Sequence, residues 1–465
     1  MQPQPRAYLA SLRREMQSLT AALDPAAAGG LNYCIDQMVS QLIARDEAMG
    51  ALTATLENSL LDAATAAGIN LAVPSSASPT ERRTEMLKAL EQAWRALPLG
   101  SAQRKALEIE SSRADDVFRK QFSEISARIA RELKEAPSPA GWDLTIKRIE
   151  AALPSLLPRW EGARVALLKP LAGLHAKEIY FLDLTLASGE IESLVLRCDR
   201  EADLTRASVA DEFPLLSALY ARGFAIPEPL VVIKDKAILG QPALIMRRVD
   251  GVEKALDALK QPERTIADAA RFLARLHTTP IEGTGFVDAA KAGGTADMWL
   301  RRIARQFDWW QDMATEPAPV MWRARRWLDD NVHLVANAAT VVHGDFSLRN
   351  LLLGEDDGIS SVLDWELANV GHPAEDLGYM RLTVESIMPW ETFDAMYRAA
   401  GGGAVTLEQI AYFDVWGLYR NLAINATVQN FFLNGKTNDY FLGTAAITYY
   451  PGLLTQLTEA LEGVD

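Results

Sequence analysis

Two short segments in the last third of the chain constrain its fold and chemistry more than any other feature. Residues 342–350 read Val-His-Gly-Asp-Phe-Ser-Leu-Arg-Asn, and residues 362–366 read Val-Leu-Asp-Trp-Glu. Asp345 is followed by Asn350 five residues later and by Asp364 fourteen residues after that. Each segment begins with apolar, strand-like residues. This order and spacing are typical of a phosphoryl-transfer site, in which strands bring two carboxylates and one amide together.

The three side chains suit chemistry on a phosphate. Asp345 can orient an acceptor hydroxyl and accept its proton late in the transfer. Asn350 offers a neutral amide oxygen and Asp364 a charged oxygen to Mg²⁺, which prefers a few protein oxygens together with substrate phosphates. The alternative is that residues 343–345 form an ordinary turn and residues 364–366 a strand end with a solvated acid. The presence of both segments, in this order, favours the chemical interpretation.

The His-Gly-Asp, Asn and Asp-Trp-Glu pattern resembles the aminoglycoside-phosphotransferase-like kinases of small molecules, a family that shares the protein-kinase fold. Gly344 stands where protein kinases carry Arg. The resemblance implies an α+β fold with a small β-rich N-lobe and a helical C-lobe. It implies an ATP-dependent enzyme that phosphorylates an alcohol group of a small molecule, with ATP and Mg²⁺ as cofactors. In this interpretation Asp345 is catalytic, and Asn350 and Asp364 bind the metal.

The resemblance extends to three supporting residues. His343 belongs to the family motif and is expected to brace the catalytic loop through a hydrogen bond. Glu366 either approaches the metal or serves as a further acid beside it. Asp376 matches a family Asp that is expected to anchor the helix that follows. His277, which closes the apolar segment 272–277, is interpreted as a core histidine.

Three strands are predicted upstream, at residues 164–171, 178–186 and 193–198. The second and third are separated by a short turn at Ser188-Gly189, which predicts an antiparallel pair. Three successive antiparallel strands followed by a helix would make a kinase-like N-lobe.

Five residues of this region are expected to contact the nucleotide. Gly173 occupies the place of the family's phosphate-covering turn, and Lys177 could reach phosphates. An ordinary hairpin turn and a surface lysine are the alternatives. Arg197 falls on the third strand, where the acyl-CoA-dehydrogenase-linked branch of the family often carries Arg, and Glu212 is its expected partner. Backbone groups near Met246, in the strand that connects the lobes, would hydrogen-bond adenine.

The acceptor is the least constrained part of the prediction. Residues 364–371 are closest to the acyl-CoA-dehydrogenase-linked branch, which phosphorylates hydroxyacyl-CoA thioesters. An aminoglycoside or sugar acceptor stays open, since a cationic aminoglycoside suits a net charge of −14. A nucleotide-binding regulatory pseudokinase is the third possibility, which the intact Asp345, Asn350 and Asp364 disfavour. Arg420 is a candidate for the acceptor pocket, and an ion pair between helices would explain it equally well.

Composition excludes several other classes. Lys and Arg number 47 against 61 Asp and Glu, which disfavours nucleic acids and anionic membranes as partners. The two cysteines, Cys34 and Cys198, have no metal-site spacing and are expected to be free thiols in a reducing compartment. No signal-peptide or membrane-spanning segment is predicted, so a cytoplasmic protein is expected. The oligomeric state stays open.

The chain is predicted to have three parts. Residues 1–136 show helical periodicity and are expected to form a helical bundle domain. Residues 136–141, with two prolines and small side chains, make a linker. Residues 140–250 are assigned to the N-lobe and residues 251–465 to the helical C-lobe with the catalytic loop.

Overall fold

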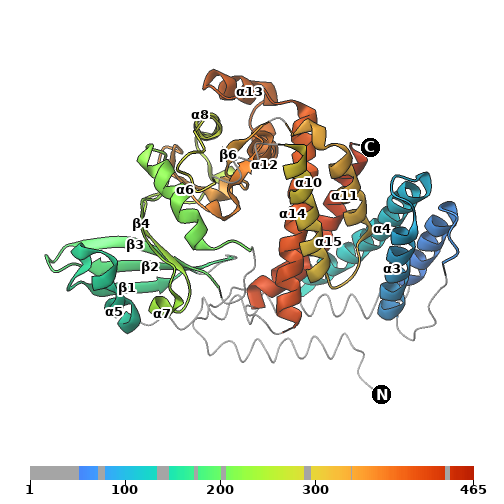
Figure 1. The fold of residues 1–465 in the computed structure, drawn as a ribbon, viewed down its shortest axis with the longest axis horizontal. Coiled ribbons are helices and arrows are strands. Elements are labelled where there is room, and N and C mark those ends of the chain that lie inside the picture. Colours follow the sequence, from blue (N-terminus) through green and yellow to red (C-terminus); the bar gives the residue numbers. More distant parts are fainter. Residues whose placement is uncertain are drawn as a thin grey trace, which may run out of the picture. The chain divides into compact units, whose positions relative to one another are not determined.

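The computed structural model (Figure 1) divides into two compact units. The first consists of Met1–Gly141, Arg301–Asn331 and Val415–Asp465, and the second of Trp142–Leu300 and Val332–Asp414. The predicted linker and the first predicted helices lie outside the residues that the structure describes. The described residues are 52–71, 79–133, 146–171, 176–200, 206–286, 295–336, 338–434 and 440–464.

The N-terminal part of the second unit is a five-stranded antiparallel sheet with the order β1-β2-β3-β5-β4. Its first three strands begin and end within two residues of the predicted ranges, so the predicted β-rich N-lobe is confirmed. The strands are β1 Arg164–Pro170, β2 Glu178–Thr185, β3 Ile191–Cys198, β4 Pro229–Ile233 and β5 Ala243–Arg247.

Helices cover both faces of this sheet, so its central strands are apolar on both sides. On β5, Ala243 and Ile245 pack with residues of α5, whereas Leu244 and Met246 pack with residues of α6. Successive side chains of a strand point to opposite faces. The helices of this part are α5 Ile146–Leu156, α6 Val209–Ala221 and the short α7 Lys236–Leu239.

The rest of the second unit is mainly helical, with two small two-stranded sheets that carry the motif segments. β6 pairs with β9 and β7 pairs with β8, both antiparallel. Helix α8 packs against β6, β8 and α13, and its buried face joins the core that includes Phe346 and Trp365. The elements are α8 Pro262–His277, β6 Thr340–Val342, β7 Leu351–Leu353, β8 Ile359–Val362, β9 Asn369–Gly371, α12 Ala374–Glu385 and α13 Trp390–Ala399.

The described residues of the first unit form helices, which come from both ends of the chain. A helix over residues 52–66 precedes α3, and α4 packs against α3, α11 and α15. Helices α10 and α14 belong partly to each unit. The labelled helices are α3 Pro79–Ala96, α4 Ala102–Leu133, α10 Ala296–Met313, α11 Pro319–Asp330, α14 Leu407–Leu433 and α15 Tyr440–Glu462.

Buried ion pairs join the N-terminal helices to the later part of the chain. Arg83 and Arg119 donate to Asp115 at 3.0 and 2.8 Å, and both also contact Glu316. The rings of Trp94 and Trp322 stack with centroids 5.0 Å apart. The apolar faces of α3 and α4 are therefore covered partly by helices from later in the chain. In a self-contained bundle, the N-terminal helices would cover only one another. The boundaries predicted at residues 136 and 250 stay predictions.

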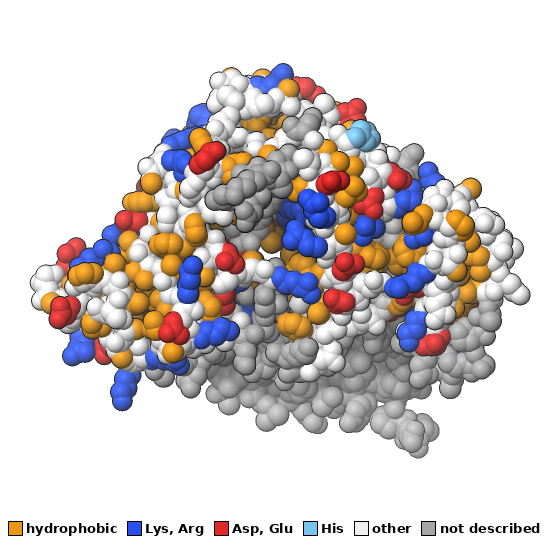
Figure 2. Space-filling view, viewed as in Figure 1, with side chains coloured by type: hydrophobic (Ala, Val, Ile, Leu, Met, Phe, Trp, Pro, Cys, Tyr) orange, Lys and Arg blue, Asp and Glu red, His pale blue; other side chains and the backbone are white. Residues whose placement is uncertain are grey.

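The face of the molecule seen in Figure 2 carries side chains of all types. Figure 2 shows Lys and Arg side chains interspersed with Asp, Glu and hydrophobic ones over the visible face. Among the helices of the described part of the chain, none is both long and apolar enough to cross a membrane.

Candidate active site

The small paired strands place the three motif residues in neighbouring loops. Asp345 follows β6, Asn350 immediately precedes β7, and Asp364 follows β8. Because β7 and β8 pair with Leu351 opposite Val362, Asn350 and Asp364 emerge at the same end of the hairpin. The backbone N–H of Leu363 donates to the Asn350 carbonyl at 2.8 Å, which ties the two loops together.

Asn350 is bonded directly to Asp345. Its Nδ2 donates to the backbone carbonyl of Asp345 at 2.8 Å and to the Asp345 Oδ2 atom at 3.0 Å. These bonds use both N–H groups of the amide and orient the Asp345 carboxylate. The Asn350 Oδ1 oxygen takes part in neither of these bonds, and it is a suitable ligand for a hard cation.

Asp376 holds the backbone of the catalytic loop. Its carboxylate is fully buried and accepts the N–H groups of His343 at 2.8 Å and Gly344 at 2.7 Å. Burial alone would raise the pKa of Asp376, but hydrogen bonds from the His277 side chain and from the backbone N–H of His343 lower it below its ordinary value. An ionised Asp376 in the first turn of α12 therefore fixes this loop. The predicted anchoring of the helix by Asp376 stays a prediction.

His343 links the two motif loops through its ring. Its Nε2 lies 2.8 Å from the Leu363 carbonyl, and its Nδ1 accepts the N–H of Asp345 at 3.3 Å. A nitrogen that accepts carries no proton, so the tautomer is the one with the proton on Nε2. This geometry is what the predicted bracing role requires, and the role itself stays a prediction.

The backbone explains why glycine occupies position 344. Gly344 has φ +80°, a region that costs other residues free energy. A Cβ atom there would lie 2.4 Å from the carbonyl oxygen of Leu367. An Arg at this position, as in protein kinases, would clash with that carbonyl, so the chain needs Gly.

Arg197 forms a buried bridge between the sheet and the motif loops. Its Nη1 donates to Glu212 at 2.6 Å and its Nη2 to Asp364 at 3.3 Å. Burial would lower the pKa of Arg197, but Glu212, Asp364 and Glu366 raise it above its ordinary value, so it stays charged. Helix α6 continues through Pro214 and still presents Glu212 to Arg197. The sequence predicted this pair.

Two further ionisable side chains, Glu366 and Lys177, lie close enough to the Arg197–Glu212 pair to affect its charges. Burial and then the charge of Asp364 raise the pKa of Glu366 to about 8, and its buried Oε2 atom has no hydrogen-bond partner among the described residues. Lys177 is buried and contacts Asp199 at 3.2 Å and the carbonyl of Ala207. A phosphate contact by Lys177 would have to compete with these partners, and it stays a prediction.

The other predicted residues lie in different surroundings. Gly173 is outside the described residues. Met246 is buried inside the sheet between β3 and β4, and the next two backbone N–H groups donate to Glu228 and Ser193. Arg420 is buried in α14 within the first unit. Their roles in binding adenine or the acceptor stay predictions.

The sequence did not reveal a buried hydrogen-bonded chain behind the catalytic loop. His277 Nε2 lies 3.0 Å from Asp376 Oδ2, and its Nδ1 lies 2.8 Å from the Tyr397 hydroxyl. The interpretation of His277 as a core residue fits its burial but missed its contact with Asp376. The only local signal was a histidine closing an apolar helix, and Tyr397 gave none because it is 120 residues away.

Comparison with known proteins defines the class of the fold first. The crystal structure of a putative aminoglycoside phosphotransferase from Ralstonia eutropha superposes with a TM-score of 0.52, over 69% of this chain and 99% of that one. The identity is 20%, so this likeness shows the fold alone. It confirms the protein-kinase-like fold of this phosphotransferase class.

The sequence comparison defines the family. The pattern of the phosphotransferase enzyme family matches residues 168–413, more than half of the chain, and the chain belongs to that family. Viomycin phosphotransferase from Streptomyces vinaceus is 30% identical over 213 residues, which are 42% of this chain and 71% of that protein.

A second kind of relative is much longer than this chain. Acyl-CoA dehydrogenase family member 11 from Gallus gallus is 28% identical over 235 residues, which are 48% of this chain and 29% of that protein. The chain therefore spans less than a third of that relative's length.

Proposed function

We propose that this protein transfers the γ-phosphoryl group of ATP to a hydroxyl of a small molecule in a Mg²⁺-dependent reaction. One observation carries the proposal. Asn350 is bonded to Asp345 at 3.0 Å, and the neighbouring Asp364 is bonded to a buried Arg197–Glu212 pair. A base, two oxygen ligands and a fixed cation are the parts that phosphoryl transfer requires.

The residues present fit Mg²⁺ and ATP. Asp364 is 42% exposed at its side chain and retains an oxygen beyond the one that Arg197 contacts. In the described part of the chain, no three His, Cys, Asp or Glu side chains are grouped so that they could hold a metal ion. Asp364 and Asn350 would hold a Mg²⁺ ion, with phosphate oxygens and water as its other ligands.

Each residue then has a definite task. When bound, ATP would supply the phosphoryl group, and Mg²⁺ would neutralise part of the charge of the phosphates. Asp345, oriented by Asn350, aligns the acceptor hydroxyl and accepts its proton. Arg197 supplies a permanent positive charge near the phosphates, and Glu212 holds that guanidinium in place. Asp376 keeps the loop that carries Asp345 in one conformation, so little reorganisation is needed during transfer.

We propose a hydroxyacyl-CoA thioester as the acceptor. The similarity to a protein named for the acyl-CoA dehydrogenase family supports this choice. Phosphorylation would turn the hydroxyl of the acyl chain into a good leaving group. Because CoA is anionic and the chain has a net charge of −14, a local basic groove is required.

The similarity to viomycin phosphotransferase supports a second candidate acceptor, a cationic antibiotic. A net charge of −14 suits such a ligand. A regulatory module without transfer activity is disfavoured, since Asp345, Asn350 and Asp364 are present together.

Steady-state transfer from ATP distinguishes these acceptors. We expect turnover with 3- and 4-hydroxyacyl-CoAs and none with viomycin or kanamycin at equal concentration. Turnover of the amines alone would contradict the thioester proposal and leave the phosphotransferase proposal intact. Nucleotide binding with no transfer to any acceptor would favour the regulatory module.

A further inference from the structure

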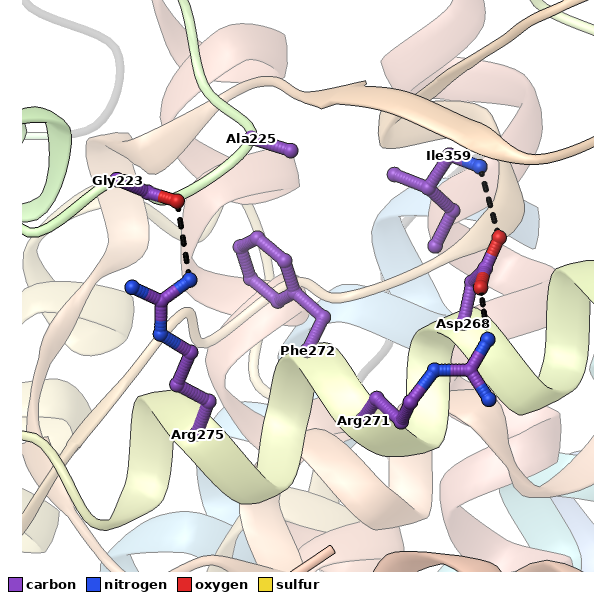
Figure 3. A pocket seen from close by; sticks show the side chains of 7 residues that line it. All are labelled: Gly223, Ala225, Asp268, Arg271, Phe272, Arg275 and Ile359. Carbon is purple, nitrogen blue, oxygen red and sulfur yellow. Dashed lines mark hydrogen bonds and ion pairs between the residues drawn. The ribbon is translucent and has the colours of Figure 1, made fainter.

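A small cavity lies beside α8, away from the motif residues. Its volume is about 260 Å³, and it is bordered by one face of α8, the loop after α6 and the start of β8. Figure 3 shows Phe272 rising from α8 between Arg271 and Arg275, with Ala225 and Ile359 on the opposite side. A half-buried aromatic ring between two guanidinium groups makes a distinctive lining.

Arg275 places a fixed positive charge on one wall. Its Nη1 donates to the Gly223 carbonyl at 2.9 Å, its Nη2 donates to the Arg222 carbonyl, and its guanidinium lies over the Phe224 ring at 4.3 Å. Within the described ranges, no carboxylate forms an ion pair with Arg275. The carbonyl groups position this charge without neutralising it.

The opposite wall carries an ion pair, in which a carboxylate neutralises the charge of a guanidinium group. Arg271 donates to Asp268, whose other oxygen accepts the N–H of Ile359 at 3.2 Å. Arg271 is 62% exposed at its side chain and uses one Nη atom in this contact. Two guanidinium groups against one carboxylate leave the cavity with a net charge of +1, which suits one negative charge better than two.

The volume of the cavity and the Phe272 ring at its base indicate the size of the ligand and its apolar part. Sites for small molecules usually measure about 300–1,000 Å³, so about 260 Å³ suits a ligand at the small end of that range. The exposed part of the Phe272 ring favours an aromatic partner, and guanidinium groups favour a carboxylate. We propose that this cavity binds a small aromatic monocarboxylate, with its ring against Phe272 and its carboxylate between Arg271 and Arg275.

The position of the floor residue gives the site a connection to the motif loops. The Phe272 ring stacks on Phe346 with centroids 5.7 Å apart and lies 6.3 Å from Trp365. These two residues directly follow Asp345 and Asp364. The cavity is nevertheless a separate site, and its occupation can be measured without nucleotide, metal or acceptor.

Ligand-observed NMR titration of the full chain with 2-naphthoate tests the proposal. A ligand of this size should bind with a dissociation constant on the order of 1 mM. Ala225→Leu, which fills the cavity, should abolish binding, and Arg271→Gln should weaken it about fivefold. Arg398→Gln is the matched control, because Arg398 is also exposed and paired with an acid four residues away on its own helix, α13.

The neutral isostere 2-naphthamide tests the charge requirement in the same experiment. Weaker binding of the amide, with normal binding of naphthoate to Arg398→Gln, supports the proposal. It is overturned if naphthoate does not bind at 10 mM, on the order of ten times the expected dissociation constant, if the amide binds equally well, or if Ala225→Leu and Arg271→Gln bind as the unaltered chain does. Circular dichroism of each variant checks that it is folded.

Discussion

Asp376→Asn should loosen the catalytic loop. The carboxylate accepts the N–H groups of His343 and Gly344 with different oxygens, at 2.8 and 2.7 Å. An Asn side chain has one acceptor oxygen, so one N–H would face an NH₂ group and lose its partner. A hydrogen bond to a charged group contributes about 1.5–3 kcal/mol. We therefore expect the amide hydrogen that loses its partner to exchange roughly 10- to 150-fold faster.

Hydrogen exchange of a peptide that covers residues 340–347, followed by mass spectrometry, measures this effect locally. Tyr397→Phe is the matched control, because it removes a neutral hydroxyl from His277 at the far end of the same chain of hydrogen bonds. That loss is about 1 kcal/mol, so the exchange should change about fivefold or less. Equal exchange in Asp376→Asn and the unaltered protein would refute the role given to Asp376.

Three further predictions follow from single contacts. Gly344→Ala should destabilise the protein in urea unfolding by more than the approximately 1–2 kcal/mol that a positive-φ substitution alone costs. Gly189→Ala is the control, because Gly189 has φ +86° and open space around it. Similar losses of unfolding free energy in both variants would contradict the clash with the Leu367 carbonyl. Arg197→Lys should raise the ATP concentration needed for half-maximal turnover, because Lys cannot contact Glu212 and a phosphate in one plane; unchanged ATP kinetics would place the phosphate cation elsewhere. Hydrogen bonds from Lys254 and from two backbone N–H groups lower the pKa of Asp357 from 3.8 to about 2, so the stability that the ionised carboxylate contributes is complete above pH 4 and is lost as the pH falls through 2. The melting temperature of Asp357→Asn should therefore fall less between pH 4 and 2 than that of the unaltered protein, and an identical pH profile would contradict this.

The sequence was most informative where local pattern determines structure. The strands at 164–170, 178–185 and 191–198 follow from runs of β-forming residues separated by turns. The motif spacing predicted the neighbourhood of Asp345 and Asn350, because the two residues lie five positions apart on the single loop between β6 and β7. The pairing of Arg197 with Glu212 was expected from the family resemblance, which places an Arg on the third strand and its partner on the helix that follows.

Contacts between distant parts of the chain could not be predicted in this way. The link from Tyr397 through His277 to Asp376 joins three helices, and the sequence around each of these residues does not indicate its partner. Similarly, periodicity showed that the N-terminal helices have apolar faces but not that α11 and α15 cover them. The sequence left open whether Lys177 contacts phosphates or is an ordinary surface lysine. It could not show that this side chain is buried, which rules out the surface alternative, or that its ammonium group pairs with Asp199.

Asp345→Asn tests the central claim most directly. Asn has nearly the same shape and can still accept the hydrogen bond from Asn350, but it cannot accept a proton from a hydroxyl. Transfer from radiolabelled ATP to the best hydroxyacyl-CoA acceptor should fall about 10²- to 10⁴-fold, while ATP binding measured by calorimetry stays unchanged. Transfer within about tenfold of the unaltered protein, well short of the loss that removing a general base causes, would contradict the assignment of Asp345 as the catalytic base.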